Sequence, residues 1–212
     1  LKLGLFGAES GLQNHEFRDS LERKWGIEAL NANYGMSEVL SMIASECKYK
    51  TGLHYRAFDK LYVEIIDHQT GTCLPIQKGI KGEMVFTNLC KEAQPLIRYR
   101  SGDIIEVKDT KCSCGYKGFV FDVIGRSDDL LVIKGLNIFV SAIDKVMATW
   151  ITYTNGQYEI LINKTDPIDT VIIRSEILDN VSIDRAELLS KIKTDMKDKL
   201  NINVGVEIVK EG

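Results

Sequence analysis

The sequence predicts an α/β domain followed by a small α+β domain, and three observations support this. Residues 3–6, a following helix and a second apolar stretch from residue 27 have the strand-helix-strand order of a parallel sheet with covering helices. Short β-branched runs within residues 61–107 are typical of antiparallel strands in a barrel-like or sandwich-like piece. After residue 125 the order becomes α-β-β-α-β, which indicates a ferredoxin-like α+β domain.

The N-terminal elements follow from spacing and breaker residues. The first helix carries Phe17, Leu21 and Trp25 on one face at four-residue spacing, and Gly26 ends it. The strands of the middle section are expected at residues 62–66, 83–86 and 104–107, with turn residues between them.

The C-terminal elements are predicted in the same way. A helix from about Ser141 places one apolar stripe toward a core, formed by Ile143, Val146, Met147 and Trp150. Strands are expected at 158–162 and 170–174. A second helix begins at Asp184, whose carboxylate can cap it while Glu187 reaches back, and it buries Leu188, Leu189, Ile192 and Met196. It ends near Leu200, and residues 202–209 alternate like a strand.

Composition excludes several classes of partner. The chain has 212 residues with 27% charged, and its net charge of -3 gives no basic footprint for nucleic acid or anionic membranes. No apolar run approaches the roughly 20 residues that span a bilayer, and the start has no signal-peptide layout. We therefore expect a cytoplasmic protein with small-molecule partners. Because the chain begins at Leu1 without a methionine, we expect it to be a fragment.

Four short stretches combine glycine with charged or polar residues. They are Gly7-Ala8-Glu9, Tyr34-Gly35-Met36-Ser37-Glu38, Arg98-Tyr99-Arg100-Ser101-Gly102-Asp103, and Gly125-Arg126-Ser127-Asp128-Asp129 followed by Lys134-Gly135. Glycine lets the backbone turn or approach a ligand closely, and the neighbouring side chains can hold a charge or a polar ligand edge. Any one of these stretches alone could be a loop with solvated charges.

Together and in this order, the stretches resemble the later core motifs of the adenylate-forming superfamily. The flanking words at 87–97 (TNLCKEAQPLI) and 130–141 (LLVIKGLNIFVS) narrow the resemblance to the phenylacetate-CoA ligase family. The resemblance covers essentially the whole chain. It implies that residues 1–125 are the C-terminal part of the large adenylation domain, 126–129 a hinge, and 130–212 the small C-terminal AMP-binding-enzyme domain with its last segment truncated.

The resemblance also implies an activity. Family members use ATP to convert a carboxylic acid, such as phenylacetate, into an acyl-adenylate, and then transfer the acyl group to coenzyme A. The cofactors and substrates implied are ATP/AMP, Mg²⁺, the acid and coenzyme A. Dimers are common in the family, so a homodimer is compatible with the resemblance.

Site residues are carried over by motif position. Tyr34 would stack on adenine, with Gly35 in its motif, Ser37 would contact phosphate, and Glu38 would hold Mg²⁺ as a catalytic residue. Gly7, Ala8 and Glu9 would line the adenine and acyl pocket, or form only a strand-end turn. Asp103 would accept the ribose hydroxyls. Arg126 would act catalytically on the ribose or phosphate side, or would form only a surface salt bridge to Asp128 or Asp129.

The resemblance places the domain movement at Asp128, the hinge about which the small domain rotates after adenylation. Lys134 and Gly135 would bind coenzyme A, because this glycine lets the pantetheine arm pass close to the backbone. Three departures from the family pattern are Ala32-Asn33 for Asp-Ile, Val140 for proline and Asp144 for glutamate.

Two parts that the family needs for turnover are absent from the printed sequence. These are the Ser/Thr/Gly-rich phosphate loop that precedes Gly7 in the family and the lysine of a Gly-Lys word beyond the last strand. We expect the isolated chain to be inactive and its parent to be active.

Cysteine and histidine positions suggest a structural metal. The chain has five cysteines, and four residues could form the Cys₃His set of a closed Zn²⁺ site: Cys47, His54, Cys112 and Cys114. Cys112 and Cys114 would point to the same face if their segment were an extended strand. Buried free thiols are the alternative.

Two other readings of the whole chain remain open. One is a non-catalytic module that binds coenzyme A, a nucleotide or a protein. The other is a zinc-stabilised structural domain in which the nucleotide motifs are degenerate.

Overall fold

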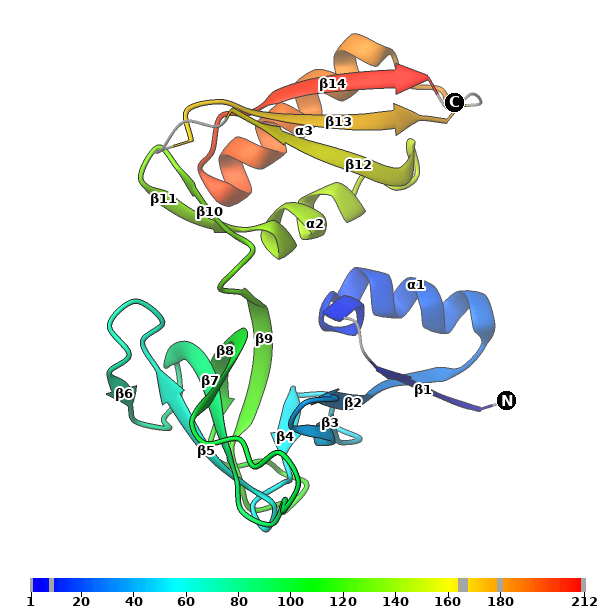
Figure 1. Cartoon of the computed structure of the whole chain (residues 1–212). Coiled ribbons are helices and arrows are strands. Elements are labelled where there is room, and N and C mark those ends of the chain that lie inside the picture. Colours follow the sequence, from blue (N-terminus) through cyan, green and yellow to red (C-terminus); the bar gives the residue numbers. More distant parts are fainter. Residues whose placement is uncertain (1, 8–9, 164–167, 179–180, 211–212) are drawn as a thin grey trace. The chain divides into compact units, whose positions relative to one another are not determined.

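The computed structural model describes residues 2–7, 10–163, 168–178 and 181–210 (Figure 1). The chain divides into two compact units, residues 1–128 and 129–212. The division falls within the segment 126–129 that the sequence analysis treats as a hinge.

The first unit is built on one nine-stranded sheet with the order β1-β2-β3-β4-β9-β8-β7-β5-β6. β1 and β2 are parallel, as the strand-helix-strand pattern predicts, and every other neighbouring pair is antiparallel. The strands are β1 (Leu3–Gly7), β2 (Glu28–Met36), β3 (Leu40–Glu46), β4 (Leu53–Tyr55), β5 (Leu61–Ile66), β6 (Cys73–Leu74), β7 (Lys81–Asn88), β8 (Tyr99–Asp109) and β9 (Val120–Arg126).

The core of the first unit forms where alternate residues of these strands turn inward. Its largest fully buried side chains include Ile43, Tyr55, Phe86, Ile105 and Phe121. Tyr55 stacks on Phe119, with ring centroids 5.3 Å apart, and its hydroxyl donates to the carbonyl of Leu61 at 2.8 Å. The β4 and β9 segments therefore share one aromatic core.

A 3₁₀ helix, η1 (Ser10–Gln13), and α1 (His15–Trp25) connect β1 to β2. Gly26 adopts a left-handed conformation with φ of 63° and ends α1 where the sequence predicts. The predicted apolar stripe is not the buried face of this helix, because Phe17 is 46% exposed and Trp25 64%. The buried residue of α1 is Arg18.

Arg18 is buried because it forms an ion pair with Glu46 of β3. Its Nη2 lies 2.9 Å from Oε1 of Glu46, and its Nε donates to the carbonyl of Leu12 at 2.9 Å. The second oxygen of Glu46 accepts the backbone N–H of Asn31 at 3.0 Å. This pair joins η1, α1, β2 and β3.

The second unit begins with a hairpin of β10 (Leu130–Ile133) and β11 (Leu136–Phe139), followed by α2 (Val140–Ala148). A three-stranded sheet follows, ordered β12-β13-β14, in which β12 and β13 are antiparallel and β13 and β14 parallel. Its elements are β12 (Thr154–Ile162), β13 (Val171–Ile177), α3 (Arg185–Leu200) and β14 (Gly205–Lys210).

The α-β-β-α-β order of this unit agrees with the sequence prediction. Ile143, Leu188, Ile192 and Met196 are fully buried in one core with Ile173 of the sheet. A ferredoxin-like unit has a further strand before its first helix. Since β10 pairs with β11 in a separate hairpin, the ferredoxin-like classification stays a prediction.

The ends of α3 also follow the sequence. Asp184 is the N-cap, and its carboxylate accepts the N–H groups of Ala186 and Glu187 at 3.0 and 3.3 Å. Asn201, with φ of 58°, ends the helix in the left-handed region.

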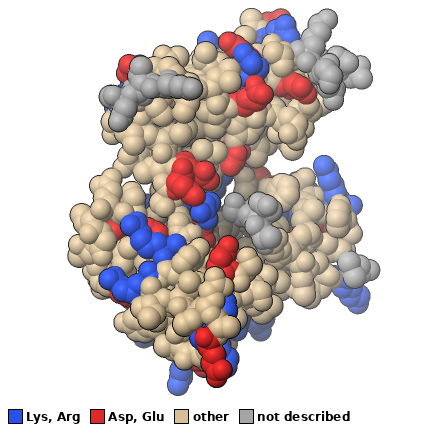
Figure 2. Space-filling view, viewed as in Figure 1, with Lys and Arg blue, Asp and Glu red and all other residues tan. Residues whose placement is uncertain are grey.

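Charged side chains of both signs are interspersed on the face of the molecule that Figure 2 shows. Within the part of the chain that the structure describes, no helix is long and apolar enough to cross a membrane.

Lys134 and Gly135 form the two-residue turn of the β10–β11 hairpin, with φ of 48° and 83°. Two positive φ values identify a type I′ turn, for which Asn-Gly is favoured and lysine is not. Lys134→Asn should therefore stabilise the second unit by about 0.5–1 kcal/mol, because left-handed strain costs roughly 1 kcal/mol or more for an ordinary residue.

Thermal denaturation of the two proteins measures this change. Lys134→Ala serves as the matched control, since alanine retains the strain. Equal effects of asparagine and alanine would contradict the explanation.

Candidate functional site

Three of the residues carried over from the family motifs meet in the first unit. The hydroxyl of Tyr34, in β2, donates to Oδ2 of Asp103, in β8, at 2.7 Å. Nη1 of Arg126, the last residue of β9, donates to Oδ1 of the same carboxylate at 3.0 Å. The two carboxylate oxygens are therefore held from opposite sides by a phenol and a guanidinium.

The register of β8 and β9 explains the contact between Asp103 and Arg126, but not the contact with Tyr34. Asp103 and Arg126 are paired directly across β8 and β9, where opposite charges attract. Tyr34 reaches them although β3 and β4 lie between β2 and β9 in the strand order. Its ring meets Phe121 of β9 edge-on, with centroids 5.4 Å apart.

Gly102 makes room for the guanidinium of Arg126. It has φ of 77°, and a Cβ at this position would lie 2.8 Å from Nη2 of Arg126. The neighbouring backbone is fixed by Ser101, whose hydroxyl donates to the carbonyl of Met84 at 2.7 Å and accepts the N–H of Asp103 at 3.1 Å. The Ser-Gly-Asp sequence therefore shapes the site as well as supplying its carboxylate.

Glu83 supports this segment and was not singled out by the sequence analysis. Its side chain is buried, accepts the N–H of Gly102 at 3.1 Å, and pairs with Nε of Arg100 at 3.0 Å. The one indication in the sequence is a carboxylate at the start of the apolar run Glu83–Phe86.

The environment shifts the pKa values of the three acids in this network. Burial raises the pKa of Asp103, against the opposing effects of Tyr34 and Arg126. Burial also raises the pKa of Tyr34 well above its usual value, with the Asp103 charge acting in the same direction. The hydrogen bond from Arg126 lowers the pKa of Asp128. Burial therefore makes the charged form of the Asp103 carboxyl less favourable than that of a solvated aspartate.

Arg126 also forks across the carboxylate of Asp128. Its Nε and Nη2 donate to Oδ1 and Oδ2 at 2.8 and 2.9 Å. The surface salt bridge to Asp128 that was the alternative for Arg126 is therefore present, together with the contact to Asp103.

Gly7 and Gly35 are placed by close backbone packing. Gly7 pairs with Asn33 across the parallel strands, one residue before Tyr34. A Cβ at Gly35 would lie 2.3 Å from the carbonyl oxygen of Ser41, so the β2–β3 hairpin itself requires this glycine.

Ser37 and Glu38 are exposed in the turn between β2 and β3. The Ser37 hydroxyl lies 3.4 Å from the Glu38 carboxylate. Lys91, which sequence reasoning did not single out, donates from Nζ to the Glu38 carbonyl at 2.8 Å. Ala8 and Glu9 lie outside the described residues. Lys134 and Gly135 belong to the second unit.

Comparison with known proteins agrees with these motifs. Residues 135–212 match the family model of the AMP-binding enzyme C-terminal domain. Over 98% of its length, the chain is 33% identical to a phenylacetate-coenzyme A ligase of Aromatoleum evansii, and over 100% it is 31% identical to that of Escherichia coli K12. The chain is a homologue of the phenylacetate-coenzyme A ligases. It spans 47% and 48% of the lengths of these two ligases.

A solved ligase has the same fold. The structure of a 2-hydroxyisobutyryl-CoA ligase, in the postadenylation state with 2-HIB-AMP, superposes with a TM-score of 0.85 and 25% identity. The match covers 100% of this chain and 45% of that ligase. The superposition shows that the chain shares its mixed α/β architecture with this part of that ligase.

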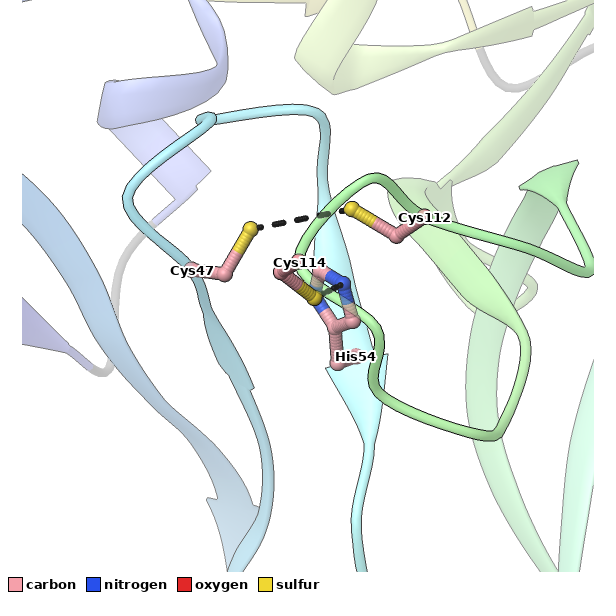
Figure 3. A group of neighbouring side chains, drawn as sticks. All are labelled: Cys47, His54, Cys112 and Cys114. Carbon is pink, nitrogen blue, oxygen red and sulfur yellow. Dashed lines mark hydrogen bonds between the residues drawn. The ribbon is translucent and has the colours of Figure 1, made fainter.

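A second group of side chains in this ligase homologue lies where the loops after β3 and β8 meet β4 (Figure 3). It consists of Cys47, His54, Cys112 and Cys114, whose ligand atoms all lie within 4.8 Å of one another. The Sγ atoms of Cys47 and Cys112 are 3.8 Å apart, and Sγ of Cys114 is 3.4 Å from Nε2 of His54. All five cysteines are free thiols.

These are the four residues that the sequence suggests for a metal site, but the strand geometry expected for one pair is wrong. Cys112 and Cys114 do not lie in an extended strand. They lie in a turn between β8 and β9, in which the N–H of Gly115 donates to the carbonyl of Cys112 at 3.0 Å. The turn, not a strand pleat, brings both thiols to His54. The backbone N–H of Cys114 lowers the pKa of Cys112 to about 6.

Proposed function

We propose that the chain is the C-terminal part of an ATP-dependent acyl-CoA ligase that activates a carboxylic acid as its acyl-adenylate and transfers the acyl group to coenzyme A. The single observation that carries this proposal is that Tyr34 and Arg126 both donate hydrogen bonds to the carboxylate of Asp103. An aryl acid such as phenylacetate is the proposed substrate, since the similar curated proteins are named phenylacetate-coenzyme A ligases. A cytoplasmic location stays a prediction from the composition, and a homodimer stays a prediction from the resemblance.

Asp103 would bind the ribose of the nucleotide. A carboxylate can accept both vicinal hydroxyls, and such charge-assisted bonds are short and strong. Tyr34 and Arg126 orient this carboxylate, and Tyr34 would meet the adenine beside it. Arg126 would stabilise the negative charge that develops on the α-phosphate, because its planar guanidinium can fork across two oxygens.

Glu38 would hold the Mg²⁺ that accompanies ATP. Its exposed carboxylate provides the hard oxygen that this ion prefers. The ion would neutralise phosphate charge during adenylation. Ser37, beside Glu38, would contact phosphate, and Lys91 would keep the turn in place through the Glu38 carbonyl. Gly7, Ala8, Glu9 and Gly35 would line the nucleotide and acyl side of the site.

Arg126 would couple the nucleotide to the hinge. In the structure its guanidinium is shared between Asp103 and Asp128. A phosphate that binds Arg126 would compete with Asp128 and free the backbone at this residue for rotation of the ferredoxin-like lobe. Lys134 and Gly135, exposed in their turn, would then accompany the pantetheine arm of coenzyme A.

Activity is proposed for the parent protein and not for these 212 residues alone. Pyrophosphate release with ATP and an aryl acid tests this in both proteins. We expect turnover by the parent and none by the chain. Turnover by the chain would refute the inactive-fragment proposal, and a parent inactive with every carboxylic acid would refute the ligase proposal.

Asp103→Asn tests the nucleotide role directly. We expect AMP binding, measured by calorimetry, to weaken roughly 10- to 100-fold, because an amide cannot replace charge-assisted acceptor bonds. Asp59→Asn is the control, since that exposed carboxylate lies outside the site, beside Lys60. Equal AMP affinity of the two variants would exclude Asp103 from the nucleotide site.

The raised pKa of Asp103 fixes the sign of two pH effects. AMP affinity should fall as pH drops through this raised pKa, that is, above the usual aspartate value of about 3.9. In the protein without AMP, the raised pKa means that protonation of Asp103 stabilises the folded state. This stabilisation is lost as the pH rises through the pKa that Asp103 has in the folded protein. Asparagine is uncharged, like the protonated carboxyl, so Asp103→Asn should leave the melting temperature at neutral pH unchanged. Weaker AMP binding by this variant would then not be caused by unfolding.

A further inference from the structure

We infer that Cys47, His54, Cys112 and Cys114 bind a structural Zn²⁺ ion that fastens together the two halves of the nine-stranded sheet (Figure 3). This site takes no part in the proposed ligase chemistry. The inference therefore does not depend on that activity.

Two of the six distances among the four ligand atoms match a tetrahedral metal, and all six are within 4.8 Å. Two sulfurs bound to zinc at about 2.3 Å each are roughly 3.8 Å apart at the tetrahedral angle. Cys47 and Cys112 are separated by 3.8 Å. A sulfur and a nitrogen bound at about 2.3 and 2.0 Å are roughly 3.5 Å apart, compared with 3.4 Å between Cys114 and His54.

The surroundings of the thiols are also those of metal ligands. The N–H of Tyr49 donates to Sγ of Cys47 at 3.4 Å, a contact that orients this sulfur. Two similar turns present Cys47 and Cys112, because the carbonyl of each accepts an N–H from three residues later, those of Lys50 and Gly115. Both of these later residues have positive φ.

The burial of His54 favours a bound metal. The imidazole is fully buried, its Nε2 lies 3.4 Å from the Cys114 thiol, and its Nδ1 has no hydrogen-bond partner among the described atoms. Without a metal, burial of this polar ring costs its hydration free energy, and few hydrogen bonds compensate for that cost. A metal–nitrogen bond at Nε2 offsets that loss.

The ligands come from both sides of a narrow connection in the sheet. The pairing of β4 with β9 is short: Leu53 pairs with Phe121 and His54 with Val120, and the N–H of Tyr55 donates to the carbonyl of Phe119 just before β9. β1 to β4 lie on one side of this connection, and β9 to β6 on the other. Cys47 and His54 belong to the first side and Cys112 and Cys114 to the second, so the ion would cross-link them.

This cross-link bears on the alignment of the nucleotide residues. Tyr34 lies on the β1–β4 side, whereas Asp103 and Arg126 lie on the other. Zn²⁺ would bind the three cysteines as thiolates and His54 as a neutral imidazole, so the protons still held by the thiols go to solvent and no oxidation state changes. The product is a closed site with no open position, which is the form of structural zinc.

Metal analysis of the tag-free chain tests the inference. Purified protein should contain about one zinc ion per chain. Two of its five cysteines, Cys73 and Cys90, should react with a thiol reagent in the native state, and all five after a chelator removes the ion. A zinc-free protein in which all five thiols react, and whose melting temperature is unchanged by chelator or added Zn²⁺, would overturn the inference.

Paired variants separate the site from nonspecific binding. Cys112→Ser with Cys114→Ser should lose the zinc, whereas Cys73→Ser with Cys90→Ser, which changes as many thiols outside the cluster, should retain it. His54→Cys should also retain zinc as a Cys₄ site, and this variant keeps the test decisive if the serine protein fails to fold. Loss of zinc from the control pair, or failure of His54→Cys to bind it, would count against the assignment.

Amide hydrogen exchange tests the role as a cross-link. Removal of zinc should speed exchange in β4 and at the facing end of β9, and leave β5 and β7 unchanged as an internal reference. Uniform protection with and without zinc would show that the ion does not hold the two halves of the sheet together.

Discussion

Glu46→Ala is expected to destabilise the first unit by about 3–5 kcal/mol, because it leaves the buried guanidinium of Arg18 without its counter-charge. Arg18 and Glu46 side chains are 6% and 4% exposed. The same substitution also leaves the backbone N–H of Asn31 without its acceptor. Urea denaturation of the Glu46→Ala chain and of the unsubstituted chain measures the difference in unfolding free energy.

Two further variants isolate the ion pair as the cause. Glu28→Ala, on the neighbouring strand, removes an exposed carboxylate 3.6 Å from Lys50 and should change stability by less than about 0.5 kcal/mol. Arg18→Met combined with Glu46→Leu should be more stable than Glu46→Ala alone, because it removes both charges together. If the unfolding free energy of Glu46→Ala lies within about 1 kcal/mol of that of the unsubstituted chain, the explanation is contradicted.

Arg126→Ala in the full-length parent is expected to slow pyrophosphate release by roughly 100-fold, since the loss of one donor to a developing oxyanion commonly has an effect of that size. The fold should persist, because the Arg126 side chain is 46% exposed. Stopped-time assays of pyrophosphate at saturating ATP measure the change in kcat.

Arg126→Lys distinguishes charge from geometry. Lysine keeps the positive charge but cannot fork across two oxygens, so it should restore only part of the rate. Arg23→Ala, at an exposed position of α1, is the surface control. If Arg126→Ala turns over like this control, the role assigned to Arg126 is wrong.

Local rules predicted the parts of the fold that depend on neighbours in sequence. Gly26 ends α1 and Asp184 begins α3 because backbone conformation and capping bonds are decided within a few residues. The hairpin of β10 and β11 escaped notice, because Lys134 is an unusual residue for the left-handed position of its turn. β4 has only three residues, too few to show an alternating pattern.

Local sequence patterns did not predict which distant residues contact one another. The resemblance identified Tyr34, Asp103 and Arg126 as site residues, but their bonds depend on sheet register and curvature that no local pattern encodes. Arg18 was missed since helical periodicity directs attention to apolar stripes, and a buried arginine is explained only by Glu46, 28 residues away. The Cys₃His group was selected by residue type, and a turn unknown from the sequence completed it.

The two units have separate apolar interiors, one around Tyr55 and Phe86 and the other around Ile143 and Ile192. A scanning calorimeter should therefore record two endotherms instead of one, and no single midpoint would describe the whole chain. Changes at Glu46 would move one endotherm and changes at Lys134 the other.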